Sequence, residues 1–253
     1  MLNKKPLNEI IFLDIETTSQ YPRFEDMPVN MKLLFLKRFD KEFQAEKSRF
    51  KDHEIPMDDQ ALIEITYNRW APIFAEWGKI ICISALRITD IDKLTYKTIS
   101  ITHTDEKQLL NTFLTKFQNI TLTKKPADAK DFLCAHNGLI FDFPYIAKRM
   151  IINGIELPAM FDFSESKPWD LVHFIDTKVV WKFGSYDNNV SLDLLCATLG
   201  VESPKTDMSG DKVKDVFWIE KDLKKIAEYC EGDVYALASC YLKMKNIQTK
   251  LTK

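Results

Sequence analysis

The chain has 253 residues, enough for one α/β domain with a full hydrophobic core that needs no disulfide or structural metal to fold. Its 35 Lys and Arg residues nearly balance 37 Asp and Glu residues, and the formal charge of -2 excludes an overall basic field, so any nucleic-acid binding must be local. Five cysteines without paired spacing exclude a disulfide or zinc framework and indicate reduced side chains that fill space.

The sequence shows neither a secretory signal nor a membrane-spanning run. The first apolar run, Ile10 to Leu13, stops at Asp14, far short of a signal-peptide core. Nowhere do about 18 uncharged apolar residues follow one another, as a bilayer-spanning helix requires. We therefore expect a cytoplasmic protein without a membrane partner.

Taken in chain order, the pattern begins with a buried β-branched strand and then breaks over residues 20–78. That stretch is rich in charge and aromatic residues, and it predicts an irregular insertion with one or two helices around residues 31–43. The other expected elements are strands at 9–15, 79–88, 94–101, 131–135 and 171–177, and helices at 104–118, 144–154, 191–200 and from 222 onward. Together they predict a single α/β domain over residues 1–253, with a mixed central sheet of about five strands flanked by helices.

The first candidate site is the pair Asp14 and Glu16 at the end of the first strand. Alternate side chains of a strand point to the same face, so both carboxylates share one side. Two carboxylates held together repel, and a bound Mg²⁺ or Mn²⁺ relieves that repulsion. Asp-x-Glu is common in solvated turns, but the apolar run from Ile10 to Leu13 implies burial and strengthens the interpretation as a metal site.

Two further candidate carboxylates follow, Asp142 at a strand-to-helix junction and Asp233 in the last helix. Asp142 comes after a strand and the tight turn permitted by Gly138, where in isolation it is best explained as a helix N-cap. Tyr229 and Asp233 are four residues apart and share a face of the last helix. Gly232 between them costs a helix about 1 kcal/mol relative to Ala, which indicates a close approach. Taken alone, a solvated polar face is the simpler interpretation of that pair.

Taken in chain order, the segments that contain Asp14 with Glu16, Asp142, and Tyr229 with Asp233 resemble the DEDD superfamily of 3′-to-5′ exonucleases. This superfamily has a ribonuclease-H-like fold. The spacing from Tyr229 to Asp233, with Glu228 where the histidine subgroup has His, resembles the tyrosine subgroup (DEDDy). The nearest likeness is to stand-alone bacterial proteins similar to the exonuclease domain of family B DNA polymerases. It covers about residues 8–18 and 78–245, including 174–176, 191–193, 199–200 and 204–210.

The resemblance implies a set of four metal ligands and a two-metal hydrolysis of phosphodiester bonds. Two divalent cations, Mg²⁺ or Mn²⁺, are the implied cofactors. Tyr229 would orient the attacking water, because a phenol with a pKa near 10 is a poor general base at neutral pH. The ligands are Asp14, Glu16, Asp142 and Asp233.

The expected partner is the 3′ end of a single-stranded nucleic acid, with DNA favoured over RNA. Asn137 would position the terminal nucleotide, and Lys148 with Arg149 would contact phosphates. Phe141 offers a surface for base stacking, as do Phe143 and Tyr145 in the same segment.

Two other functions remain open. Ribonuclease D-like exoribonucleases share the tyrosine-type constellation, so RNA is the alternative substrate. The other alternative is a catalytically silent nucleic-acid-binding module, which gains little from keeping a repulsive carboxylate cluster. Asp176 and Asp193 are interpreted as strand-end and helix-start residues and not as further ligands.

Overall fold

The structure of the chain is a computed structural model that describes residues 5–53, 57–118, 120, 131–167, 169–186, 190–202, 208–247 and 250–252. Residues 204–207, part of one stretch that carries the family resemblance, lie outside the described residues. Within the described ranges, no helix is both long and apolar enough to cross a bilayer.

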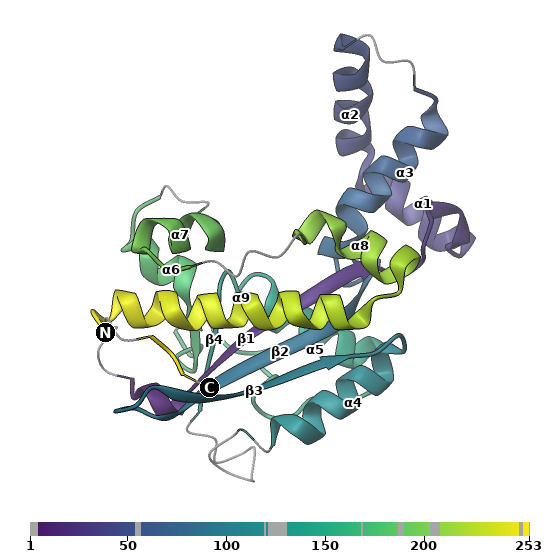
Figure 1. Ribbon diagram of the computed structural model, residues 1–253. Coiled ribbons are helices and arrows are strands. Elements are labelled where there is room, and N and C mark those ends of the chain that lie inside the picture. The colour runs from purple at the N-terminus through teal and green to yellow at the C-terminus, as the bar shows by residue number, and fades with distance from the viewer. Residues whose placement is uncertain are drawn as a thin grey trace.

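A five-stranded mixed sheet forms the centre of the molecule, in the order β3-β2-β1-β4-β5 (Figure 1). β1 pairs antiparallel with β2, and β2 with β3, whereas β1–β4 and β4–β5 are parallel. This confirms the predicted α/β class with a mixed sheet of five strands. The strands are β1 (Ile10–Ser19), β2 (Gly78–Asp90), β3 (Thr95–Thr102), β4 (Phe132–Ala135) and β5 (Phe174–Asp176).

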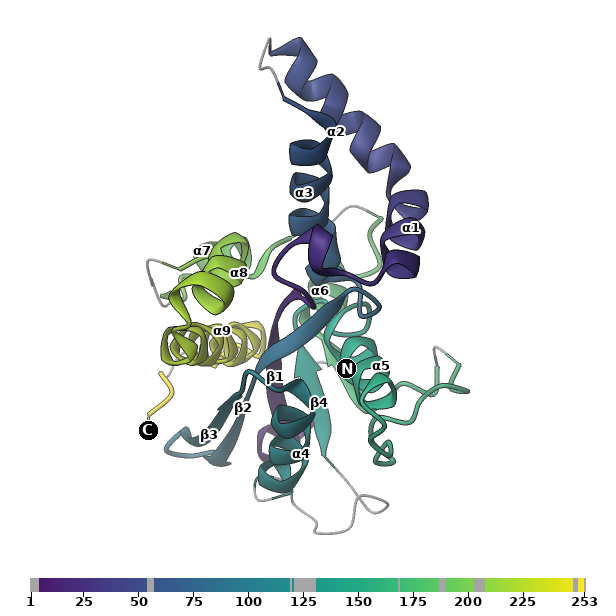
Figure 2. The same cartoon turned by 90° about the vertical axis from the view of Figure 1, so that its right-hand side faces the viewer.

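Helices cover both faces of the sheet (Figures 1 and 2). Ile11 and Leu13 of β1 pack with α4 and α5 on one face, whereas Ile10 and Phe12 pack with α9 on the other. The period-two alternation of strand side chains thus builds two cores from one apolar run. The α-helices are α1 (Val29–Arg38), α2 (Asp40–Asp52), α3 (Asp59–Trp70), α4 (Glu106–Phe117), α5 (Asp142–Ile152), α6 (Thr177–Lys182), α7 (Leu192–Leu199), α8 (Val213–Asp215) and α9 (Leu223–Met244).

Side chains at the helix starts explain several boundaries. Ser191 and Asp222 cap α7 and α9 as predicted, each accepting a backbone N–H three residues ahead, at 3.2 and 2.9 Å. Gly200 ends α7 in the left-handed conformation, with φ of 64°. The predicted cap of α4 is wrong by one residue, because Asp105 and not Thr104 accepts the N–H of Gln108, at 3.0 Å.

The described residues between β1 and β2, 20–53 and 57–77, form a helical segment that we call the arm. It contains α1, α2 and α3, so the prediction of one or two helices is wrong. The chain bends between α1 and α2 at Phe39, whose φ of -109° and ψ of 20° break the helix without a proline or glycine. α2 and α3 extend beyond the sheet (Figures 1 and 2). Aromatic packing around Phe24, Phe35, Phe39 and Tyr67 gives the arm its own core.

Candidate metal and active site

Asp14 and Glu16 lie in the middle of β1, on the face that α9 covers. β1 is longer than predicted and runs on to Ser19, so the two acids are not at its end. Glu16 is 8% exposed and Asp14 is half-buried. Their carboxylate oxygens and the thiol of Cys230 lie within 4.8 Å of one another. The strand period therefore brings the two acids together on one face, as expected.

Asp142 reaches this pair around a free edge of β1. β4 pairs with β1 only as far as Phe12, so beyond that point no strand of the described residues lies beside β1 on this side. Burial has the largest effect on the pKa of Asp142, and the backbone of Ile15 also acts on it, so this carboxyl lies near β1. A β-bulge between Glu16 and Thr17 interrupts the pairing of β1 with β2 at the same level. Because β4 is short, Asp142 of α5, on one face of the sheet, can approach Asp14 and Glu16, which lie on the other face.

Electrostatics show that the acids act on one another. Burial raises the pKa of Asp142 to about 7, and repulsion from Asp176 adds to this. Burial also raises the pKa of Asp14 well above its usual range, followed by repulsion from Asp142, Glu16 and Asp233. Glu16 is affected in the same way, by burial first and then by Asp233. A bound divalent cation would offset this repulsion, so the donor set fits a metal of the Mg²⁺ or Mn²⁺ type.

Tyr229 and Asp233 extend the cluster from α9. Tyr229 lies one helical turn before Asp233, and its hydroxyl is close enough to the Asp233 carboxylate for each group to influence the pKa of the other. Burial raises the pKa of Asp233 to about 6. Burial, followed by the charges of Asp233 and Glu16, raises the pKa of Tyr229 above its usual value. Tyr229 therefore keeps its proton and can donate a hydrogen bond but not accept a proton at neutral pH.

Cys230 is a site residue that the sequence did not reveal. Its thiol lies 3.5 Å from the Asp14 carbonyl and 3.6 Å from Asp14 Oδ2. All five cysteines are free and buried, but Cys230 does more than fill space, because it contacts a predicted metal ligand. Its position next to Tyr229 on the buried side of α9 was the available signal.

The turn before α5 is anchored by Asp176. The N–H groups of Asn137 and Leu139 donate to the two Asp176 carboxylate oxygens, at 3.0 and 3.2 Å. Asp176 also caps α6, so its interpretation as a strand-end and helix-start residue is confirmed. Asn137 has a φ of 70°, a conformation that asparagine tolerates. Its contact with a nucleotide stays a prediction.

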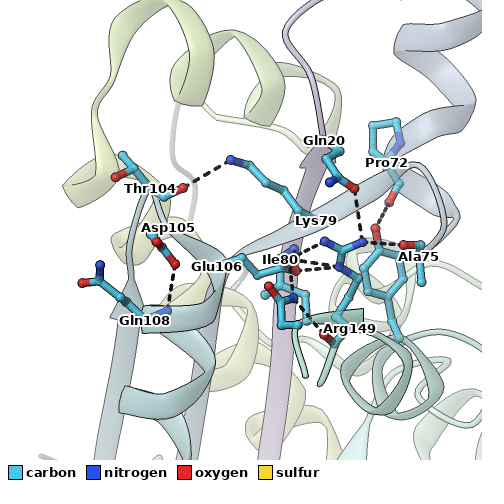
Figure 3. Close-up of polar contacts among 12 residues, drawn as sticks. Gln20, Pro72, Ala75, Lys79, Ile80, Thr104, Asp105, Glu106, Gln108 and Arg149 are labelled. Carbon is cyan, nitrogen blue, oxygen red and sulfur yellow. Dashed lines mark hydrogen bonds and ion pairs between the residues drawn. The ribbon is translucent and has the colours of Figure 1, made fainter. Parts of the chain in front are cut away.

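The prediction that Arg149 contacts phosphates is wrong. Its side chain is 2% exposed and its Nε donates to both Glu106 carboxylate oxygens, at 2.9 and 3.0 Å. Nη1 also donates to the Gln20 side chain and the Ala75 carbonyl (Figure 3). The guanidinium is therefore committed to the interior. Lys148 is exposed, with its Nζ 3.5 Å from Glu76, and its phosphate contact stays a prediction.

The structure also changes which aromatic side chains can stack on bases. Phe143 and Tyr145 are 1% and 3% exposed and belong to the core, so stacking on them is excluded. Phe141 is half-buried against Tyr145, with ring centroids 5.2 Å apart. Among the described residues, exposed aromatic side chains flank β5, with Trp169 before it and with Phe183, at the end of α6, and Tyr186 after it. Sequence patterns did not distinguish these from core residues.

A comparison with protein families shows which family the chain belongs to. Residues 73–253 match a family described as predicted 3′-5′ exonucleases related to the exonuclease domain of PolB. The chain belongs to this family. The matched range contains α5 and α9 with their acids, whereas β1 and most of the arm precede it. The predicted likeness to the exonuclease domain of family B polymerases is thereby confirmed, and the tyrosine subgroup stays a prediction.

Solved structures support the same fold. The chain is similar to the family B DNA polymerase from the hyperthermophilic archaeon Pyrobaculum calidifontis, with a TM-score of 0.56 and 13% sequence identity. The match covers 96% of this chain and 24% of the polymerase chain. The fold is that of a polymerase exonuclease domain, ribonuclease-H-like as predicted. A comparison with curated proteins finds no match.

Proposed function

We propose that the protein is a metal-dependent 3′-to-5′ exonuclease that removes nucleotides from single-stranded DNA. The observation that carries this proposal is the pair Asp14 and Glu16 on one face of β1, whose pKa values are raised by burial and then by charges that include those of Asp142 and Asp233. Their burial and mutual repulsion would be hard to retain without a cationic ligand. Membership of a family of predicted exonucleases supports the same conclusion.

The four acids would hold two divalent cations, Mg²⁺ or Mn²⁺. We assign Asp14, Glu16 and Asp233 to one ion, with Asp14 shared and Asp142 serving the second. The chemistry that such ions supply when bound is activation of a water molecule and stabilisation of the oxygens that attack and leave phosphorus.

The residues of the chain itself would orient the reacting groups. Tyr229 keeps its proton and can hydrogen-bond a water held beside Asp233. Cys230 contacts both the backbone and the carboxylate of Asp14, which restricts the rotamer of that acid. Asn137 lies in the turn that precedes Asp142 and would contact a terminal nucleotide.

The substrate test uses 5′-labelled single-stranded DNA and RNA of equal sequence, incubated with Mg²⁺, Mn²⁺ or EDTA. We expect a ladder that shortens from the 3′ end with DNA and metal, and no shortening in EDTA. Faster shortening of RNA would replace the DNA assignment with the exoribonuclease alternative. Intact strands of both kinds with both metals would contradict catalysis and leave a nucleic-acid-binding module.

A further inference from the structure

The point where the arm returns to the sheet contacts both elements that carry the predicted metal ligands. The Pro72 carbonyl accepts hydrogen bonds from the Thr17 hydroxyl at 2.9 Å and from the Tyr145 hydroxyl at 3.0 Å. Thr17 follows Glu16 in β1, and Tyr145 lies three residues after Asp142 in α5. One carbonyl of the arm therefore links the strand and the helix on which the acids are placed.

This contact is closely packed. A Cβ at Gly78 would overlap the Tyr145 hydroxyl and lie 2.8 Å from the Ala71 carbonyl, so only glycine permits the arm to approach α5 this closely. Burial raises the pKa of Tyr145 above its usual value, so the phenol stays protonated and remains a donor.

A second contact ties the same helix to both ends of the arm. Arg149 of α5 donates to the Gln20 side chain, where the arm begins, and to the Ala75 carbonyl, where it ends, at 3.4 and 2.8 Å (Figure 3). Glu106, the carboxylate partner of Arg149, also accepts the N–H of Ile80 in β2, at 2.7 Å. The contacts of the Pro72 carbonyl and of Arg149 thus hold α5 against the arm and the sheet at two separate points.

The sheet alone does not hold β1 and α5 at a defined distance here, because β4 does not pair with β1 beyond Phe12. We propose that the arm acts as a clamp through the Pro72 carbonyl, with Thr17 and Tyr145 as positioning residues for the metal site. This inference rests on the proposed function, since it concerns the same site. It also assigns a role to the arm, most of which precedes the range matched by the exonuclease family.

The test compares Mn²⁺ binding by the intact purified protein and by Tyr145→Phe, with free Mn²⁺ measured by electron paramagnetic resonance. Loss of one donor to Pro72 should weaken Mn²⁺ affinity roughly fivefold, the change that one ordinary hydrogen bond corresponds to. Tyr241→Phe is the matched control, because Tyr241 is equally buried but belongs to the core on the α9 face. It should bind Mn²⁺ like the wild type.

Thr17 provides an independent pair of variants should Tyr145→Phe fail to fold. Thr17→Ser keeps the hydroxyl and should bind like the wild type, whereas Thr17→Val should show the weakened affinity. Excess Mn²⁺ should restore the turnover of Tyr145→Phe to that of the wild type.

The outcomes separate the clamp from the site itself. Wild-type affinity in both Tyr145→Phe and Thr17→Val, together with loss of binding in Asp14→Ala, would overturn the clamp and leave the metal site standing. Absence of Mn²⁺ binding by the wild type, with or without single-stranded DNA, would overturn the proposed function and the clamp with it.

Discussion

Asp142 is both a helix-start residue and a member of the carboxylate cluster. It is the first residue of α5, and the residue in the N-cap position is Phe141, so the interpretation of Asp142 as the N-cap is wrong by one residue. Its role as a metal ligand stays a prediction. A helix start suits an acid that has to be held charged beside a cation, because the N-terminal end of the helix dipole favours negative charge.

The raised pKa values predict how the metal-free protein responds to pH. In the unfolded chain these acids ionise near pH 4, whereas in the folded chain Asp142 and Asp233 ionise near pH 7 and 6. Between those limits the folded state holds more protons, so the free energy of unfolding should fall as pH rises from about 4 to about 7. Melting temperatures in EDTA across this range measure the effect.

Two controls test the origin of that pH dependence. Asp142→Asn should show a flatter dependence, because the substituted amide does not ionise. Added Mn²⁺ should raise the melting temperature of the wild type most strongly above pH 7. A wild-type melting temperature that rises between pH 4 and 7 in EDTA, unchanged in slope by the substitution, would contradict the buried cluster.

Tyr229→Phe tests the role of the phenol. Losing its hydrogen bond to a charged group should lower the turnover number roughly 10- to 100-fold, while Mn²⁺ affinity stays close to that of the wild type. Turnover under saturating DNA and metal, with Mn²⁺ binding measured in parallel, distinguishes this role from ligand loss. Equal loss of turnover and of metal affinity would show that Tyr229 acts mainly by holding Asp233.

At the scale of elements, the site depends on unequal strand lengths. β1 has ten residues and β4 has four, so half of β1 has a free edge that α5 can approach. Local sequence predicts the shared face of Asp14 and Glu16 and the i,i+4 pair on α9, because strand and helix periods are local properties. The predicted strand 131–135 ends where β4 ends, at Ala135, but local sequence does not predict that β1 runs on to Ser19, since that depends on pairing with β2 far along the chain.

The prediction for Arg149 was wrong for the same reason, because its burial also depends on contacts far along the chain. Its partner Glu106 is 43 residues away, and both lie on amphipathic helices whose surface charges look alike in sequence. Caps and helix ends were predictable because Ser191, Asp222 and Gly200 act within a few residues. Burial of a paired charge was not, because it depends on how α4 and α5 come together.

Arg149→Met should therefore reduce stability and not substrate affinity. Removing one partner of a buried ion pair leaves Glu106 uncompensated, which costs roughly 3–5 kcal/mol in the free energy of unfolding. Urea unfolding measures this, and Lys148→Met is the matched control, because its exposed pair contributes at most about 1 kcal/mol. An Arg149→Met protein of wild-type stability with weakened DNA binding would restore the phosphate assignment.

At the scale of the whole molecule, a near-neutral chain must bind a polyanion through local features. The fold and the order of the acidic segments were predictable because the resemblance covers the sheet and α9. The three-helix arm was not, because its helix break at Phe39 has no proline or glycine. The exposed aromatic residues Phe183 and Tyr186 also required the structure, because exposure is a property of the assembled fold.

We expect these two aromatic residues to stack on bases of the single strand. α6, about 9 Å long, joins Phe183 to Asp176 and hence to the turn before Asp142. Phe183→Ala or Tyr186→Ala should raise KM for single-stranded DNA roughly 5- to 100-fold, the range for losing one stacked base. Trp169→Ala is the control, since this exposed residue precedes β5 and lies away from the carboxyl ends of the parallel strands. An unchanged KM in both variants would contradict the prediction that the single strand stacks on Phe183 and Tyr186.

The most direct test of the metal-dependent exonuclease is the shortening of 5′-labelled single-stranded DNA by wild type and Asp14→Ala at saturating Mn²⁺. Asp14 is the acid whose pKa responds to all three of the others, so its loss should abolish shortening while the protein remains folded. A ladder from the 3′ end with the wild type alone is the result that the carboxylate cluster predicts. Equal shortening by Asp14→Ala would contradict the assignment of the active site to these four acids.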